Sequence, residues 1–129
     1  MTTPLYFPVA GCGGTAKPSA AGYDKRWLVV DAASNWLGTG KCPRLAEVAV
    51  EVNLGYLVLR APGMLRLDIP LDVIEDDDSV RGVAKVGSQS VDVVDEGDLA
   101  AAWFAKFLEQ PCRLVKVHPE AGRVLWPAL

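Results

Sequence analysis

Short apolar runs separated by turn-forming residues recur along almost the whole chain, and this pattern constrains the fold most strongly. The clearest example is Glu47–Val52, in which Val48, Val50 and Val52 alternate with other residues. Such alternation places the three valines on one face of an extended strand. Similar runs occupy residues 5–7, 26–30, 36–38, 56–59, 65–69, 83–86 and 90–93. We therefore expect a mainly β fold that contains several hairpins.

One segment, residues 97–109, has the spacing of a helix instead. Its apolar residues are Leu99, Ala100, Trp103, Phe104, Phe107 and Leu108. Spacings of three and four place these side chains on one helical face. Asp95 or Asp98 is expected to cap the start of the helix, and Pro111 to end it. We expect this face to cover an open end of the β structure.

Composition and charge restrict the class of protein. The chain has 129 residues, half of them hydrophobic, and a net charge of −3, so a single globular domain over residues 1–129 is expected. The longest basic block, Lys25-Arg26, is too short for a nucleic-acid-binding face. No apolar run approaches the ~18 residues that span a bilayer, and Met1–Pro4 has no signal-peptide character. Three widely spaced cysteines predict neither a disulfide framework nor a zinc site, and we expect a cytoplasmic protein.

Few side chains carry the chemistry of catalysis or metal binding. Cys112 enters an apolar run and is expected to be a buried thiol. Cys42 follows Lys41 and is the candidate for a reactive thiol, because a neighbouring cation favours the thiolate. His118 is the only histidine, and with Pro119 after it we expect an exposed, inert side chain. We therefore predict no catalytic residue and no metal ligand.

Three further features have structural interpretations. Glu75–Asp78 lacks the spacing of a calcium loop and is expected to be a solvated loop. Gly11–Thr15 lacks the Gly-Lys-Ser/Thr ending of a phosphate-binding loop and is expected to be a flexible turn. The tryptophans divide into two expected core residues, Trp27 and Trp103, and two candidates for an exposed contact surface, Trp36 and Trp126.

Several short segments occur in the order found in one known family. They are Tyr6-Phe7-Pro8-Val9, Asp24-Lys25-Arg26-Trp27, Pro43-Arg44-Leu45, Ala61-Pro62-Gly63-Met64, Trp103-Phe104 and Pro111-Cys112-Arg113-Leu114-Val115. With these segments the chain resembles the N-terminal β-barrel domain of the MOSC family over roughly residues 5–117. The resemblance implies a small β-barrel with one α-helix near residues 97–109 packed against it. In that family the barrel precedes a catalytic domain that holds a molybdenum cofactor.

The resemblance also implies where an anion would bind. In full-length members, three basic positions are expected to hold the phosphate of the pterin cofactor. The first is Ala10 in this chain, the second is Lys25 with Arg26 beside it, and the third falls at about Gly40. Positioned Lys and Arg groups bind phosphate through charge-assisted hydrogen bonds, so this loss of donors disfavours the cofactor. The remaining candidates for an anion site are Lys25, Arg26, Lys41 and Arg44.

The resemblance leaves three interpretations of function open. The first is a stand-alone, non-catalytic domain that binds a protein or a small ligand and holds no cofactor alone. The second is one half of a split molybdenum-cofactor-dependent reductase or sulfur-carrier enzyme, whose catalytic domain is a separate chain. The third is a structural or interaction module without a small ligand. The expected partners are a separate MOSC catalytic domain or a second copy, with the tail Gly122–Pro127 adding a strand or covering an apolar surface.

Overall fold

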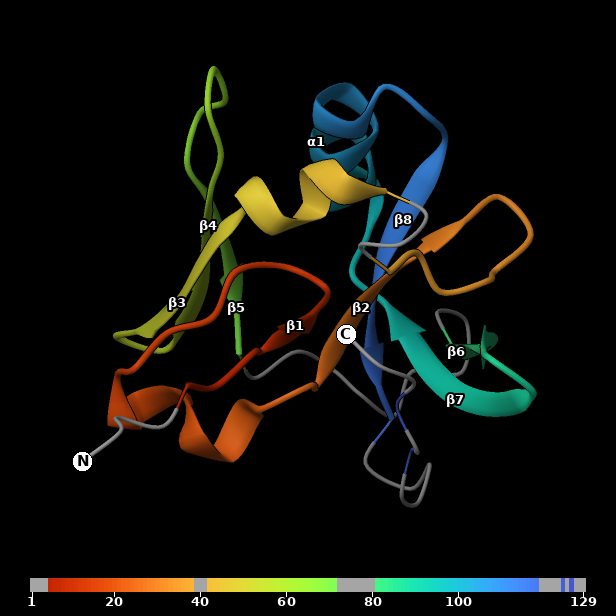
Figure 1. Cartoon of the computed structure of the whole chain (residues 1–129), viewed down its shortest axis with the longest axis horizontal. Coiled ribbons are helices and arrows are strands. Elements are labelled where there is room, and N and C mark those ends of the chain that lie inside the picture. The colour runs from red at the N-terminus through yellow and green to blue at the C-terminus, as the bar shows by residue number, and fades with distance from the viewer. Residues whose placement is uncertain (1–4, 39–41, 72–80, 119–123, 125, 127–129) are drawn as a thin grey trace.

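The computed structural model describes residues 5–38, 42–71, 81–118, 124 and 126, and its described strands form two sheets (Figure 1). The five-stranded sheet contains, in sheet order, β1 (Val9–Ala10), β2 (Trp27–Asp31), β8 (Cys112–Val117), β7 (Gln89–Asp95) and β6 (Arg81–Val86). The three-stranded sheet contains β3 (Ala49–Asn53), β4 (Tyr56–Arg60) and β5 (Leu67–Pro70). The helices are the 3₁₀ helices η1 (Pro18–Tyr23) and η2 (Pro43–Glu47), and the α-helix α1 (Asp98–Leu108).

The prediction of a mainly β fold with one α-helix is confirmed, but the two sheets are not closed into a barrel. Alternate side chains of β3, such as Val50 and Val52, are buried and face the larger sheet. The sheets therefore meet through apolar side chains rather than through a shared ladder of hydrogen bonds. Gly13, between β1 and η1, donates one backbone bond to the carbonyl of Val48 at 2.9 Å.

We call the apolar layer between the two sheets the inter-sheet core. It includes Val9, Trp27, Val29, Cys112 and Leu114 of the larger sheet, Val50, Val52, Leu57, Leu59, Leu67 and Ile69 of the smaller one, and Ala100, Trp103, Phe104, Phe107 and Leu108 of α1. Phe104 and Trp27 are fully buried there. Helix α1 connects β7 to β8 and lies beside η2 at one end of this layer (Figure 1). The expected helix covering an open end of the β structure is therefore confirmed.

A second apolar cluster lies on the opposite face of the five-stranded sheet. We call it the curled-sheet core, after the curvature of this sheet. It contains Ala10, Leu28, Val30, Trp36, Ala84, Val86, Val91, Val93, Val115 and Val117, with Val124 and Trp126 packed against it. Strand β7 curves strongly (Figure 1). Residues 34–37 bridge the gap between β2 and β6, since Leu37 donates to Val29 and Lys85 donates to Ser34, both at 2.8 Å.

The hairpin predicted for residues 83–93 is confirmed as β6 and β7, and the alternation at residues 48–52 is confirmed as β3. The strand predicted at residues 5–7 is wrong, because Tyr6 makes only an isolated bridge to Thr15. The side chain of Asp24 accepts a hydrogen bond from the backbone of Phe7 at 2.7 Å, which occupies that backbone donor. The first strand is β1, which runs parallel to β2.

Helix α1 corrects two details of the sequence prediction. Gly97, with φ of 103°, occupies the N-cap position, and neither expected aspartate caps the helix with its side chain. Asp95 instead accepts a hydrogen bond from the backbone of Gly97 at 3.1 Å. Leu99 is 75% exposed, because it lies about 140° around the helix axis from Phe104, the centre of the buried face.

His118, which was expected to be exposed, and Trp36, a candidate for an exposed contact surface, are both buried. His118 is 6% exposed, since the chain continues alongside β7 and His118 donates its backbone N–H to Asp92 at 2.9 Å. Trp36 is 8% exposed. Its indole Nε1 donates to the carbonyl of Ala10 at 3.2 Å, and the ring of Trp126 packs edge-on against it at 5.2 Å between centroids.

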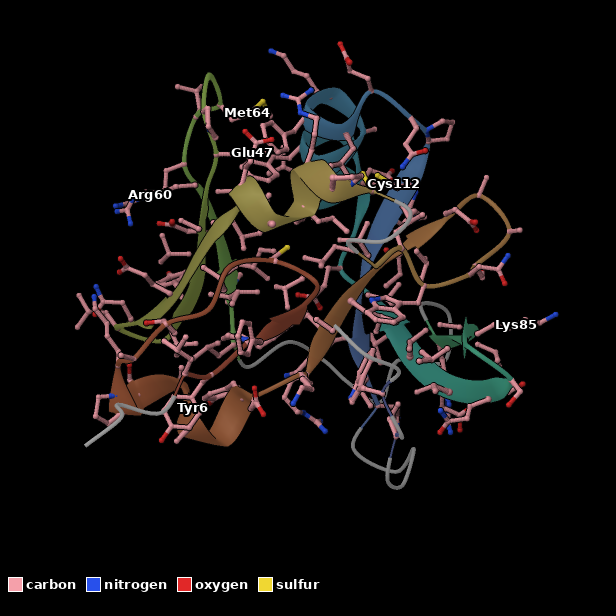
Figure 2. All side chains as sticks on the ribbon, in the orientation of Figure 1. Tyr6, Glu47, Arg60, Met64, Lys85 and Cys112 are labelled. Carbon is pink, nitrogen blue, oxygen red and sulfur yellow. The ribbon has the colours of Figure 1, made fainter. Side chains whose placement is uncertain are left out.

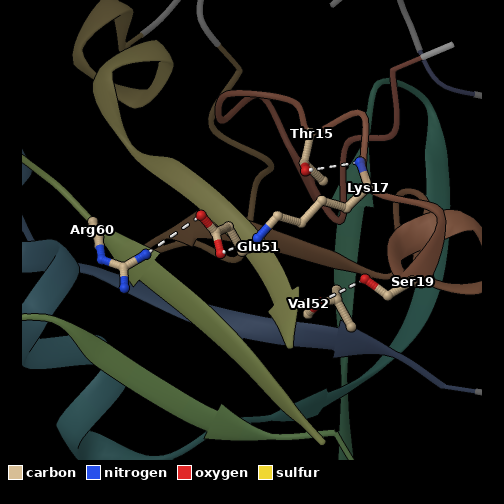
Figure 3. A network of polar contacts seen from close by, with 6 residues as sticks. All are labelled: Thr15, Lys17, Ser19, Glu51, Val52 and Arg60. Atoms are coloured by element: carbon tan, nitrogen blue, oxygen red, sulfur yellow. Dashed lines mark hydrogen bonds and ion pairs between the residues drawn. The ribbon is translucent and has the colours of Figure 1, made fainter. Parts of the chain in front are cut away.

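Polar contacts fasten η1 and its preceding loop to the outer face of the smaller sheet (Figure 3). Glu51 of β3 pairs with the Nζ of Lys17 at 2.9 Å and with Arg60 of β4 at 3.5 Å. These contacts, chiefly the hydrogen bond from Lys17, lower the pKa of Glu51 below its ordinary value. The hydroxyl of Ser19 donates to the carbonyl of Val52 at 2.7 Å. The network holds η1 against the smaller sheet, and the carboxylate of Glu51 is paired with both Lys17 and Arg60.

Candidate functional site

The predicted anion site does not form a single cluster in the described part of the chain. Lys25 and Arg26 lie together at the start of β2. The Nζ of Lys25 is 3.3 Å from Asp24, and Arg26 Nη2 donates to the carbonyl of Val117 at 3.1 Å. Both cations therefore already have partners, and binding of an anion by this pair stays a prediction.

Arg44 lies elsewhere, in η2 beside the end of α1. Its guanidinium is 4.4 Å from the centroid of the Phe107 ring and 3.7 Å from the carboxylates of Glu47 and Glu109. Arg26 lies beside the end of β8, whereas Glu109 comes shortly before its beginning. A six-residue strand such as β8 spans about 17 Å, so Arg44 and the Lys25–Arg26 pair are well separated. Lys41 lies outside the described residues.

The position of Ala10 does not fit the phosphate site that the resemblance implies. Ala10 is fully buried in β1, and its carbonyl accepts the hydrogen bond from Trp36. A fully buried ammonium group at this position would lose its hydration, which is costly without a paired charge. The described residues therefore do not provide the set of donors expected for the pterin phosphate.

A groove of about 620 Å³ lies at the end of the curled sheet beside α1. Its floor is Val30, Ala84, Val93 and Val115, its first wall is Ala101, Ala102 and Ala105 of α1, and its second wall is Ala32, Ser34 and residues 81–83 of β6. The four floor side chains are buried, and most of the side chains in the two walls are small. An apolar concavity with a few polar groups at its rim is the usual form of a binding site.

Charged residues surround this groove. Arg113 lines it and is held by two carboxylates, Asp95 at 2.7 Å and Asp98 at 2.9 Å. The hydrogen bonds from Arg113 to Asp98 and Asp95 raise the pKa of its guanidinium above the ordinary value. Arg81 also lines the groove and pairs with Asp92 at 3.0 Å. With Asp31 added, four carboxylates stand against two guanidinium groups at this end of the sheet.

The sequence analysis missed this groove, although two signals pointed to it. The first is the run Ala100–Ala102 with Ala105, which leaves one side of α1 without large side chains. The second is Gly82 inside an otherwise β-forming run. A Cβ atom built at Gly82 would meet nothing within 4 Å. Neither signal locates the groove by itself, because its floor combines the β6–β7 hairpin with β2 and β8, which are distant from it or from each other in sequence.

The three cysteines are free thiols and all are buried in the inter-sheet core. Burial, with a smaller contribution from the neighbouring Cys42, raises the pKa of Cys112 to about 11 and that of Cys12 still further above its ordinary value. The prediction of a buried Cys112 is confirmed (Figure 2). Cys42 is 7% exposed, so it lacks the accessibility of a reactive thiol. No group of three metal-ligating side chains was found among the described residues.

Two other expectations concern the glycine-rich segment and the acidic loop. Tyr6 and Thr15 exchange two backbone hydrogen bonds of 2.8 Å, so Gly11–Thr15 forms part of a turn, as expected. The acidic run Glu75–Asp78 lies outside the described residues. In the part of the chain that the structure describes, no helix has the length and apolar character to cross a membrane.

Comparison with known proteins places this geometry in a family. The MOSC N-terminal beta barrel domain matches residues 4–111. The chain is 31% identical to molybdenum cofactor sulfurase of Danio rerio over 93% of its own length and 16% of that protein. It is 27% identical to mitochondrial amidoxime reducing component 2 of Bos taurus over 95% of its length and 40% of that protein. The chain therefore spans well under half the length of these relatives.

A solved structure resembles the whole chain. It is the solution structure of a protein of Bordetella bronchiseptica, which has 62% sequence identity and a TM-score of 0.84. The match covers 99% of this chain and 98% of the solved one. The family match, the relatives and this structure lead to one conclusion: the chain belongs to the MOSC N-terminal beta barrel domain family.

Proposed function

We propose that this domain works by binding rather than by catalysis, and that its ligand site is the groove between α1, β6 and the end of β2. The observation that carries the proposal is the asymmetry of the curled-sheet core. Trp126 packs over the part of this core around Trp36, whereas Val30, Val93 and Val115 form the floor of a 620 Å³ groove. The walls are preformed by small side chains, so a ligand could enter without unfolding any described element.

The chemistry of the described residues supports binding over catalysis. A nucleophilic thiol needs a lowered pKa and access, whereas burial raises the pKa of Cys12 and Cys112. A general base must reach its substrate, and His118 is buried. Three buried, free thiols suit a reducing compartment, and we place the action of the domain in the cytoplasm.

A titration of the isotopically labelled chain with a library of small organic fragments, followed by amide chemical shifts in NMR, tests this proposal. We expect the largest shifts at the floor residues Val30, Val93 and Val115. In the variant Ala102→Arg, a bulky charged side chain enters the groove wall and those shifts should disappear. Leu99→Arg is the matched control, because Leu99 lies on the same helix and is exposed but does not line the groove.

Two results would overturn the proposal. If no fragment perturbs the floor, the third interpretation, a structural module without a small ligand, would become the better account. If the largest shifts instead occur at Lys25 and Arg26, the site would be the predicted anion site at the start of β2. Ala102→Arg and Leu99→Arg must both retain the amide spectrum of the folded chain for this comparison to be valid.

A second candidate function is favoured by the curated relatives. Both are named for molybdenum cofactor or amidoxime-reducing chemistry, and this chain matches only part of each. On that basis the domain would be one half of a split enzyme and would dock with a separate MOSC catalytic domain. Buried Ala10 opposes this candidate, since it removes one expected phosphate donor.

A native mass spectrum of the chain purified from its own source at low salt separates the two candidates. A second polypeptide together with a mass increment that matches a pterin cofactor would favour the split enzyme. A monomer or homodimer without that increment would favour the binding module.

A further inference from the structure

Strand β6 is the edge of the five-stranded sheet, and its hydrogen-bonding directions can be assigned from one residue. Lys85 donates its backbone N–H to Ser34 and accepts a bond from the N–H of Trp36, both at 2.8 Å. The backbone of Lys85 therefore points away from β7. Since these directions alternate along an antiparallel strand, the backbone groups of Val83 and Arg81 also point away from β7.

Arg81, Gly82 and Val83, earlier on this strand, are all exposed. Arg81, Gly82 and Val83 all line the groove, and Val83 is 52% exposed. The backbone bonds found at this edge in the described part of the chain are those of Lys85. The side chain of Lys85 itself points outward from the molecule (Figure 2). An exposed strand edge is a template for another extended segment.

The fold already uses this edge once in the same way. Asn35 forms a parallel bridge with Lys85, so a short extended segment pairs with the C-terminal end of β6. Residues 32 and 34 then line the groove rather than continuing along the edge. A second extended segment could lie next to Val83 and Arg81 and place its alternate side chains over the apolar floor. This geometry is the strand-addition mode of peptide recognition.

The charge at this end of the sheet indicates what such a segment would carry. The carboxylates of Asp31, Asp92, Asp95 and Asp98 outnumber the guanidinium groups of Arg81 and Arg113. Asp98 is 97% exposed at its side chain and can accept a second cation. Complementary charge favours a basic partner and disfavours an acidic one.

We propose that the groove receives an extended segment of a partner protein that carries Lys or Arg side chains, and that this segment pairs with the β6 edge at Arg81 and Val83. The inference rests on the proposed function, because it names the ligand of the same groove. It specifies two recognition elements, the backbone groups of β6 and the carboxylates at the rim.

The test uses a blocked hexapeptide of alternating Val and Lys, titrated into the labelled chain while amide shifts and hydrogen exchange are recorded. We expect shifts at Arg81, Val83 and the floor, and slower exchange at the amide of Val83. The Val-Glu peptide should bind about tenfold more weakly, as should a Val-Lys peptide that is N-methylated at alternate residues, because N-methylation removes a strand-pairing donor.

Val83→Pro tests the same contact from the protein side. Proline removes the N–H of residue 83, which points away from β7, so the β6–β7 ladder retains its bonds. We expect about tenfold weaker binding of the Val-Lys peptide, whereas the matched control Val83→Thr keeps the N–H and should bind normally. If Val83→Pro does not fold, the N-methylated peptide still decides the question with the unaltered protein.

The outcomes separate this inference from the proposed function. Fragment shifts at the floor without binding of the Val-Lys peptide would overturn the inference and leave the proposed function standing. Equal binding of the Val-Lys and Val-Glu peptides, or of the N-methylated peptide, would also overturn it. Protection of the Val83 amide that rises with protein concentration in the absence of peptide would identify a second copy as the occupant and overturn it. No binding of fragments or peptides would overturn both.

Discussion

The two apolar cores of this domain are built from the same five-stranded sheet but end differently. The inter-sheet core is covered by α1, and its central side chains, such as Phe104 and Leu114, are fully buried. The curled-sheet core is covered by Trp126 around Trp36 and continues beside α1 into the groove. We therefore expect one face of the sheet to contribute most of the stability, and we propose the opposite face as the binding surface.

The largest effect is expected in the inter-sheet core. Phe104→Ala should lower the free energy of unfolding by about 3–5 kcal/mol, because it leaves a cavity at a fully buried position. Leu99→Ala, on the exposed side of the same helix, should change it by no more than about 0.5 kcal/mol. Chemical denaturation of the two variants gives both values. Equal losses would show that α1 does not seal this core.

A smaller effect is expected at the covered end of the curled-sheet core. Trp126→Ala removes the edge-on contact with Trp36 and should cost about 1–2 kcal/mol. Trp36 should become more exposed, which a red shift of tryptophan fluorescence would report. An unchanged unfolding midpoint and spectrum would contradict the account of this end as sealed.

The ion pairs beside the groove should contribute less. Asp95→Ala removes a partner of Arg113 and the acceptor of the Gly97 N–H, and we expect a loss of about 1 kcal/mol. Asp98→Ala removes the other partner of Arg113. Because the Asp98 side chain is 97% exposed, this change should cost less than about 0.5 kcal/mol. Thermal unfolding distinguishes the two, and a larger loss for Asp98→Ala would contradict the assignment.

The smallest effect is expected at Glu51, outside both cores. Because the pKa of Glu51 is lowered in the folded chain from 4.5, its contribution is complete above that value and is lost as the pH falls through the folded pKa. The stability difference between the wild type and Glu51→Gln should therefore shrink between about pH 6 and about pH 3. A difference that grows on acidification would have the wrong sign.

The sequence predicted those parts of the fold that depend on local periodicity. Val50 and Val52 are buried in β3 as their alternation indicated, and the helix boundaries near residues 97–109 match α1. Local patterns did not predict which side chains would be buried by distant parts of the chain. His118 was expected to be exposed and Trp36 was a candidate for an exposed surface, but contacts with Asp92 and Trp126 from distant parts of the chain bury them.

The candidate site was less predictable for a similar reason. Lys25 and Arg44 occur in segments that resemble the cofactor-facing side of the family, yet they lie at opposite ends of the sheet. The groove requires α1 and β6 to meet the ends of β2 and β8. No single segment determines that arrangement, although Gly82 and the alanine run of α1 are sequence features that contribute to it.

The most direct test of the central claim is to fill the groove from its own strand. Gly82→Leu places a large side chain in open space at a position without positive φ, and Gly22→Leu does the same in η1, away from the groove. The fragment titration should give floor shifts at Val30, Val93 and Val115 in the wild type and in Gly22→Leu, and none in Gly82→Leu. Unchanged floor shifts in a folded Gly82→Leu variant would contradict the assignment of this groove as the binding site.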